Sequence, residues 1–254
     1  MTPAAPITLY GSGTGFDLPD KSPFVLKTEM QLKMAGLAYR KHPGNRDSAP
    51  KGKLPYLEDE GERIADSTFI RAHIERKYEL DLDEGLTPRQ RAESWAIERL
   101  LEDHLYWALL YYRWVDPDNF AKGPAHFVDN APEDKRAQLR IEIQARVTDN
   151  LRIHGLGRHT PEEVLELGKR SLSTLAALLG DQPFFIGARP TAIDATAFAM
   201  LAGVLTPFFT SPLRDAAEHY PNLVAYTDRM MQRYFPDQPW TTQASQNARA
   251  AAPF

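Results

Sequence analysis

Residues 52–67 are GKLPYLEDEGERIADS, and this stretch carries the clearest structural signals in the chain. Two short β-prone runs, 56–58 and 63–65, flank a turn-forming Asp-Glu-Gly and predict a hairpin. Pro55 suits the start of a strand, because proline donates no ladder hydrogen bond. Ser67 is expected to cap the helix that follows. The stretch therefore predicts a loop, an antiparallel hairpin and a helix in immediate succession.

Upstream of this stretch, strand-like and helix-like pieces alternate. Residues 7–10 form a β-prone run, and Ser22–Pro23 opens a helix with a good cap and a proline at its first position. Gly36 fits the end of that helix, and residues 38–41 follow as a second strand. A strand–helix–strand unit is parallel and right-handed as a rule. We therefore predict a small mixed sheet with helices on its faces.

The pattern changes in the second half of the chain. Residues 80–88 are acidic and end in a Gly, Thr and Pro, as linkers commonly do. We predict an α/β domain at 1–80, a linker at 81–87 and an all-α C-terminal domain at 88–254. Helices are expected at about 87–115, 132–153, 161–179, 191–205 and 221–235, several of them opening near a proline.

Composition excludes several classes of function. With 43% hydrophobic and 25% charged residues, the chain should form a packed core. Its 30 basic and 34 acidic residues give a net charge of -4, which argues against a nucleic-acid partner. Cysteine is absent, which excludes disulfides, thiolate metal sites and a cysteine nucleophile.

No targeting or membrane segment is expected. The first residues, MTPAAPITLYGSG, lack the basic region and apolar core of a signal peptide. The uncharged stretch 195–213 contains Pro207 and several polar residues, whereas a membrane span needs about 20 mostly apolar residues. We therefore predict a buried helix there, no membrane insertion, and a cytoplasmic protein.

Leu54–Pro55 gives the first chemical hint. A cis bond at this position would turn the backbone N–H and C=O of Leu54 outward, where they could pair with a peptide ligand as an added strand. The alternative is an ordinary trans proline at the start of a strand.

Two helix starts give further hints. The N-terminus at Asp66–Ser67 offers free N–H groups for a carboxylate, and the Asp can hold an ammonium group, which together would suit an amino acid. The Ser22 hydroxyl could hydrogen-bond a bound thiolate. The alternative for both positions is a plain helix cap.

Two other motifs are weak. The glycine-rich run at 11–15 lacks the third glycine of a dinucleotide fingerprint, because position 16 is Phe, and no Gly-Lys-Ser/Thr follows. His154 and His159 have no carboxylate at a standard metal-ligand spacing. We predict neither a phosphate loop nor a metal site.

The order of these motifs resembles a glutathione transferase. The strand, the Ser22–Pro23 helix, the second strand, Leu54–Pro55, the hairpin and the Asp66–Ser67 helix look like its thioredoxin-like N-terminal domain. Thr191 and Asp194 are similar to the capping box before the family's buried core helix. The likeness is nearest to bacterial glutathione transferase-like proteins related to failed axon connections and metaxin, on residues 22–27 and 101–107 among others.

The resemblance implies that glutathione binds as a substrate. The backbone of Leu54, before a cis Pro55, would pair with the cysteinyl part of glutathione. Asp66 and Ser67 would hold the γ-glutamyl end. Lys53 would reach the glycine carboxylate, with Lys41 as the competing cation.

The resemblance also implies a thiol activator. Ser22 falls where serine-type members of the family place the activating hydroxyl, and the lack of cysteine excludes the mixed-disulfide chemistry of the cysteine-type branch. The long loop 11–21 departs from the common pattern, so Ser12 and Tyr10 stay open as alternative activators.

The second substrate should lie between the two domains. Tyr106, Trp107, Tyr111 and Trp114 occupy one long predicted helix, and residues 107, 111 and 114 share a face. They would line an apolar pocket for an electrophile, with Arg113 as a polar neighbour. The alternative is that this aromatic stripe belongs to the core.

The sequence therefore supports two functions. The leading hypothesis is a glutathione S-transferase-like enzyme that conjugates the thiolate of glutathione to a small electrophile; a lyase, isomerase or peroxidase would be a variant of it. The alternative is a non-catalytic interaction module of the failed axon connections/metaxin type. The resemblance also predicts a homodimer.

Overall fold

A computed structural model describes residues 7–240 and contains one mixed four-stranded sheet. Its strands are β1 (Ile7–Gly11), β2 (Tyr39–Pro43), β3 (Tyr56–Asp59) and β4 (Glu62–Ala65), in the spatial order β2-β1-β3-β4. β1 runs parallel to β2, while β3 is antiparallel to both β1 and β4. The predicted parallel unit and the predicted hairpin are both confirmed.

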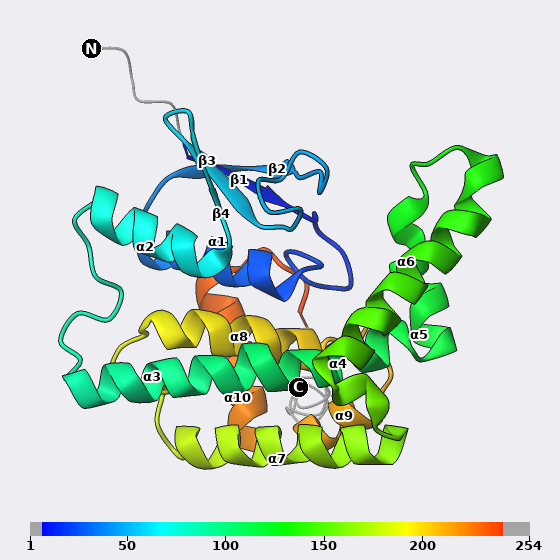
Figure 1. Cartoon of the computed structure of the whole chain (residues 1–254). Helices are drawn as coiled ribbons and strands as arrows, with labels where there is room; N and C mark the ends of the chain where they lie inside the picture. The colour runs from blue at the N-terminus through cyan, green and yellow to red at the C-terminus, as the bar shows by residue number, and fades with distance from the viewer. Residues whose placement is uncertain (1–6, 241–254) are drawn as a thin grey trace, which may run out of the picture.

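Two helices cover one face of the sheet (Figure 1). They are α1 (Pro23–Met34) and α2 (Ser67–Lys77). Because strand side chains alternate, Leu9 and Leu57 point to this face and pack with Val25 of α1 and Ile70 of α2. The other face carries Tyr10 and Tyr56, which pack with Ala49 and Leu54 of the segment between β2 and β3.

The prediction that Ser67 caps α2 is wrong by one residue. Asp66 is the N-cap, and its carboxylate accepts a 3.0 Å hydrogen bond from the Thr68 backbone N–H. A short carboxylate reaches the second N–H of a helix readily. Ser67 is instead the first helical residue and is buried.

The C-terminal domain is helical, as predicted, but its first helix is interrupted. α3 (Pro88–Leu100) continues through a π-helical turn (Leu101–Leu105) into α4 (Tyr106–Trp114). The sequence predicted one uniform helix, because a π turn leaves no residue signature in the apolar spacing. The turn shifts the side chains that follow it around the axis.

The remaining helices include two that the sequence analysis missed, at 117–122 and 212–218. Both are shorter than ten residues, so they show too few turns for an apolar period to stand out. The set is α5 (Pro117–Lys122), α6 (Glu133–His154), α7 (Pro161–Leu179), α8 (Ala192–Leu205), α9 (Pro212–Glu218) and α10 (Pro221–Tyr234). Short 3₁₀ turns occupy Pro124–Val128 and Leu156–Arg158.

Helix α8 forms the centre of the molecule, and every one of its residues is buried. Its start carries the predicted Asp194 contact: the carboxylate accepts from the Thr191 N–H at 2.8 Å. The same carboxylate accepts from the Phe185 N–H and from the Tyr226 hydroxyl, each at 3.0 Å. Asp194 therefore joins α8 to α10 and to the segment between α7 and α8.

A buried ion-pair cluster joins α1 to the helical domain. The Lys27 ammonium, 1% exposed, lies 2.6 Å from Glu102 of the π turn and 3.4 Å from Glu98 of α3. Arg99 pairs with the same two carboxylates at 2.7 and 2.9 Å. Four charged side chains thus balance in pairs, which makes their burial at the domain contact tolerable.

Among the helices of the described chain, none is both long and apolar enough to cross a membrane.

Candidate functional site

The predicted ligand-binding residues meet at one edge of the sheet. In the strand register, Tyr10 lies opposite Tyr56, and Tyr56 lies opposite Ala65. The end of β1, the start of β3 and the end of β4 therefore share this edge. That arrangement places Leu54–Pro55 beside Asp66, although the two are separated by the whole hairpin.

The Leu54–Pro55 peptide bond is cis, as the resemblance predicted. Within residues 7–240, the N–H and C=O of Leu54 form no hydrogen bond, whereas the Pro55 carbonyl accepts from the Asp66 N–H at 3.4 Å. Backbone groups are rarely left without a partner. Leu54 therefore presents a free donor and a free acceptor at the entrance to β3.

Gly44 lets the segment before Leu54 lie close to β1. Its N–H donates to the Gly11 carbonyl at 2.8 Å. A Cβ at position 44 would lie 2.4 Å from Cδ2 of Leu54 and 3.3 Å from Cβ of Tyr10. Because glycine has no side chain, the Leu54 side chain can occupy the space next to residue 44.

Asp66 adopts an unusual backbone conformation, with φ of 79°. This left-handed region is uncommon for residues other than glycine and persists where the surrounding structure enforces it. The exposed Asp66 carboxylate bonds the Thr68 N–H, and Ser67 is 4% exposed at the first position of α2. The pair thus offers a carboxylate, a hydroxyl and a helix N-terminus beside Pro55.

Ser22 stands at the N-terminus of α1, as predicted. Its hydroxyl does not cap the helix, because the side chain makes no capping hydrogen bond. Its backbone N–H donates at 2.9 Å to the buried carboxylate of Asp20. Pro23 has no N–H, and the early N–H groups of a helix have no intrahelical acceptor. An anion at this end of α1 would therefore meet the hydroxyl and the positive end of the helix dipole.

The long loop before Ser22 is anchored to the helical domain. Phe16 packs against Phe208 and Phe209, with ring centroids 5.1 and 4.9 Å away, and its carbonyl accepts from the Thr206 hydroxyl at 2.6 Å. Phe16 and Asp17 both have positive φ. This anchoring fixes the chain that leads into Ser22.

The alternative activator Tyr10 lies on the other face of the sheet from α1. Its ring stacks on Tyr56 at 4.3 Å between centroids. Ser12 follows the end of β1 in the anchored loop and is half-buried. Of the three candidates, Ser22 is the one at a helix N-terminus.

The two candidate cations differ in availability. Lys41 lies 2.7 Å from Glu29 and 3.1 Å from Asp20, and it also donates to the Pro19 carbonyl. Burial raises the pKa of Asp20, and Lys41 opposes that rise. Lys53 is exposed and forms no ion pair within residues 7–240. Lys53 is thus the cation with a free ammonium group.

The predicted aromatic stripe divides between the domain contact and the core. Tyr106 packs edge-on against Phe24 of α1 at 4.8 Å. Trp107 stacks on His154 of α6 at 4.1 Å, whereas Trp114 is buried. Tyr111 lies against its neighbour Tyr112. Tyr106 is therefore the member that reaches the α1 end of the candidate site.

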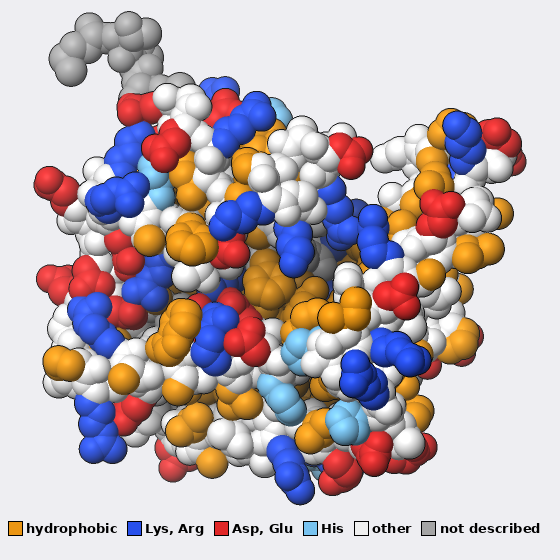
Figure 2. All heavy atoms as spheres, viewed as in Figure 1, with side chains coloured by type: hydrophobic (Ala, Val, Ile, Leu, Met, Phe, Trp, Pro, Cys, Tyr) orange, Lys and Arg blue, Asp and Glu red, His pale blue; other side chains and the backbone are white. Residues whose placement is uncertain are grey.

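A hollow lies between the N-terminal domain and the helical domain, with hydrophobic side chains at its base, Lys and Arg side chains along its upper edge and acidic side chains at its lower left (Figure 2). Burial raises the pKa of Tyr106, and the positive charges of Arg113 and Arg46 oppose that rise. Arg46 is exposed, and partial desolvation of its guanidinium together with the positive charge of Arg146 lowers its pKa. Arg46 and Arg113 thus both act electrostatically on Tyr106, and Arg146 acts on Arg46.

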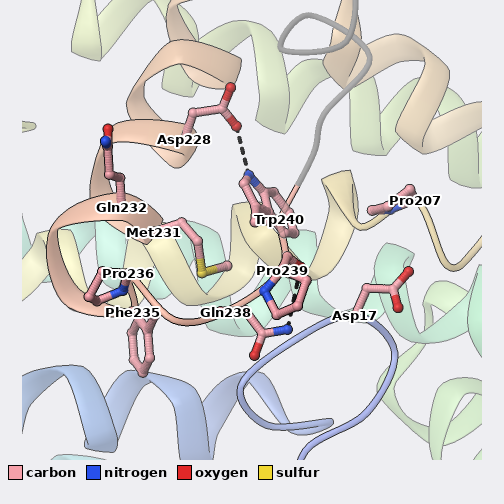
Figure 3. Close-up of a pocket in the computed structure, with 10 residues that line it drawn as sticks. All are labelled: Asp17, Pro207, Asp228, Met231, Gln232, Phe235, Pro236, Gln238, Pro239 and Trp240. Carbon is pink, nitrogen blue, oxygen red and sulfur yellow. Dashed lines mark hydrogen bonds between the residues drawn. The ribbon is translucent and has the colours of Figure 1, made fainter.

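A second concavity lies apart from the sheet edge (Figure 3). Its volume is about 700 Å³, and it contains none of the predicted site residues. Its lining comes from α10 and the segment after it, together with Asp17 and Pro207. Among residues 7–240, no three His, Asp or Glu side chains gather as metal ligands would.

Sequence reasoning missed Asp20 and did not predict that Arg113 is buried. Asp20 was hidden in the loop that departs from the family pattern, and its contact with Ser22 depends on how that loop folds. Arg113 was expected to be a polar neighbour of the second-substrate pocket, but it is 5% exposed and buried beneath α1. A charged residue in an aromatic run, YYRWV, was the available signal.

Comparison with known families identifies both halves of the chain. Residues 23–119 match the glutathione S-transferase N-terminal domain, and residues 168–230 match the glutathione S-transferase C-terminal domain. Among solved structures, the beta-etherase LigF from Sphingobium sp. strain SYK-6 superposes with a TM-score of 0.61 at 17% identity, covering 98% of this chain and 100% of that one.

Similar curated proteins include one named as an enzyme and two whose names state no activity. Failed axon connections of Drosophila melanogaster is 38% identical over 87% of this chain, but the match spans 56% of that longer protein. Isoprene-epoxide–glutathione S-transferase of Rhodococcus sp. (strain AD45) is 29% identical over 90% of this chain and 99% of its own length. Metaxin-1 of Macaca fascicularis is 30% identical over 92% of this chain and 76% of its own.

Proposed function

Because the chain belongs to the glutathione S-transferase family, we propose that it binds glutathione at the sheet edge and conjugates its thiolate to a small electrophile. The free backbone N–H and C=O of Leu54, beside the cis bond to Pro55, carry this proposal. An extended tripeptide can pair with such groups as an added strand, and main-chain hydrogen bonds then supply affinity without regard to side chain.

The far end of glutathione suits the start of α2. The γ-glutamyl group carries both an ammonium and a carboxylate. The exposed Asp66 would hold the ammonium, while Ser67 and the N-terminus of α2 would hold the carboxylate. Lys53, which has no acidic partner of its own in the described chain, would meet the glycine carboxylate.

The Ser22 hydroxyl would meet the thiol of glutathione. A free thiol has a pKa near ~8.5, and lowering it by about two units takes ~2.7 kcal/mol of thiolate stabilisation. One charge-assisted hydrogen bond contributes ~1.5–3 kcal/mol, and a helix N-terminus adds ~0.3–1 kcal/mol. The Ser22 hydroxyl and the first turn of α1 are therefore sufficient in magnitude, with glutathione itself as the nucleophile.

The electrophile would enter the hollow next to Tyr106. This tyrosine contacts Phe24, two residues after Ser22, so an apolar substrate there would lie close to the thiolate. An epoxide is the first electrophile to test, since one relative is an isoprene-epoxide–glutathione S-transferase.

Calorimetric titration with glutathione tests the binding step, and no binding up to several millimolar would remove the proposal. Turnover is then measured against epoxides and other small electrophiles. Ser22→Ala should abolish the ultraviolet thiolate absorbance of the binary complex and most of the turnover while glutathione still binds. If absorbance and turnover survive, Ser22 is not the activator, and Ser12→Ala and Tyr10→Phe are the next variants.

A second candidate function is a non-catalytic interaction module. The 38% identity to Failed axon connections favours it, because this identity exceeds the 29% shared with the isoprene-epoxide enzyme. Glutathione binding without turnover of any electrophile would select this function. Under either function we expect a cytoplasmic homodimer, and light scattering on the purified chain measures the oligomeric state.

A further inference from the structure

Arg113 is a buried cation without an acidic partner. It belongs to α4, is 5% exposed, and forms no ion pair within residues 7–240. Its two Nη atoms donate to backbone carbonyls, at 2.7 Å to Gly203 and 3.3 Å to Lys21, and its Nε has no partner. Burying an unpaired charge costs free energy, so we looked for a role that the buried guanidinium could have.

The helical domain holds Arg113 tightly against the start of α1. Its guanidinium carbon lies 5.0 Å from the centre of the Phe209 ring and 5.7 Å from that of Phe16. A Cβ on Gly203 would lie 3.2 Å from an Arg113 Nη atom and 3.5 Å from Cγ of Pro23. Gly203 therefore leaves the room in which the guanidinium contacts the N-terminus of α1.

Arg113 and Asp20 hydrogen-bond the same peptide group, one at its carbonyl and the other at its N–H. The peptide that joins Lys21 to Ser22 offers its carbonyl to Arg113 at 3.3 Å and its N–H to Asp20 at 2.9 Å. Pro23, whose ring fixes its own φ, follows immediately. The backbone at Ser22 is thus held by a cation from one domain and an anion from the other.

Charged groups of both signs lie around Ser22. Asp20 and Glu29 share one cation, Lys41, so this cluster carries one excess negative charge when both carboxylates are ionised. Lys21, whose ammonium lies over the Phe127 ring, and Arg46 near Tyr106 are further cations in this part of the molecule. Arg113 differs from them because its guanidinium hydrogen-bonds the peptide that leads into Ser22, which brings an unpaired positive charge next to the position of a thiolate at Ser22.

We propose that Arg113 is a positioning residue that fixes the Ser22 backbone and stabilises the thiolate of bound glutathione by its charge. The inference rests on the proposed function and assigns part of the thiol activation to the helical domain. Burial lowers the pKa of Arg113 to about 10, and Tyr106 opposes that shift. The guanidinium therefore stays charged at neutral pH, where the thiolate must form.

The decisive experiment compares Arg113→Lys with Arg113→Met. The two side chains have similar length, but only lysine keeps the charge. Each variant is saturated with glutathione, and the pKa of the bound thiol is read from thiolate absorbance across pH. We expect Arg113→Met to raise that pKa by about one unit, the low end of the effect of a nearby opposite charge. Arg113→Lys should stay close to the wild type.

Arg140→Met, a change to an arginine of α6 that bonds Asp129 and Ala125, is the matched control and should leave the thiol pKa unchanged. Equal shifts in the Lys and Met variants, or none in either, overturn the inference. If Arg113→Met does not fold, Arg113→Gln takes its place. Failure of the proposed function is a separate result: the wild type itself would then bind no glutathione.

Discussion

Removing the Asp194 carboxylate should destabilise the whole molecule. Asp194→Ala deprives three buried donors of their acceptor: the N–H groups of Thr191 and Phe185 and the hydroxyl of Thr191. The Tyr226 hydroxyl also loses the carboxylate but keeps the Asp194 backbone carbonyl as an acceptor at 3.1 Å. An unsatisfied buried donor costs about 1–3 kcal/mol. A value near the lower limit for each of the three, about 1.3 kcal/mol, gives a loss of about 4 kcal/mol.

For a chain of this size, each kcal/mol shifts the melting temperature by about 2–4 °C, so we expect a fall of roughly 10 °C. Asp194→Asn, which keeps one acceptor oxygen in the same place, should lose less than half as much. Differential scanning calorimetry of the three proteins measures both effects. A fall below 3 °C for Asp194→Ala would show that this carboxylate does not link α8 to its neighbours, and the reasoning would be wrong.

Three further predictions follow from buried or close contacts. Lys27→Met should lower the free energy of unfolding, measured in urea, by about 3 kcal/mol. This is the low end for breaking a buried ion pair, because Arg99 still pairs with both glutamates. A loss under 1 kcal/mol would contradict the role of this cluster. Asp59 is buried, which alone raises its pKa, but hydrogen bonds from Lys77, His73 and Tyr78 outweigh burial and lower it. Its contribution is therefore present above the unfolded value near ~4 and is lost as the pH falls through the lower folded pKa; Asp59→Asn should remove that part of the acid dependence of the melting temperature, and an unchanged pH profile would refute it. Gly44→Ala should push the Leu54 side chain aside and weaken glutathione binding severalfold by calorimetry. Gly36→Ala is the control: its added Cβ meets no atom within 4 Å, but its φ of 66° strains an alanine, so it should lower stability without displacing Leu54 or weakening binding.

The sequence predicted best those elements whose formation depends on residues adjacent in the chain. The hairpin at 56–65 follows from strand-forming runs on either side of an Asp-Glu-Gly turn, and α1 follows from a Ser-Pro start. The cap of α2 was missed by one residue, because Asp and Ser are both good N-caps and their order alone does not choose between them. The π turn at Leu101–Leu105 was missed because it leaves no signature in the apolar spacing; in the fold it carries Glu102, which pairs with Lys27 of α1.

The residues of the candidate site also divide into those that a local motif predicts and those that depend on contacts distant in sequence. Leu54–Pro55 and Asp66–Ser67 could be named from sequence, because each is a local motif whose meaning does not depend on distant residues. Arg113 could not be assigned its place, because its contact with the Lys21 carbonyl joins residues 92 positions apart. Its burial depends on the loop anchored by Phe16 and on the space left by Gly203. A thiol site built in this way needs both domains docked, so variants that loosen the α1 contact, such as Lys27→Met, should raise the thiol pKa as well as lower stability.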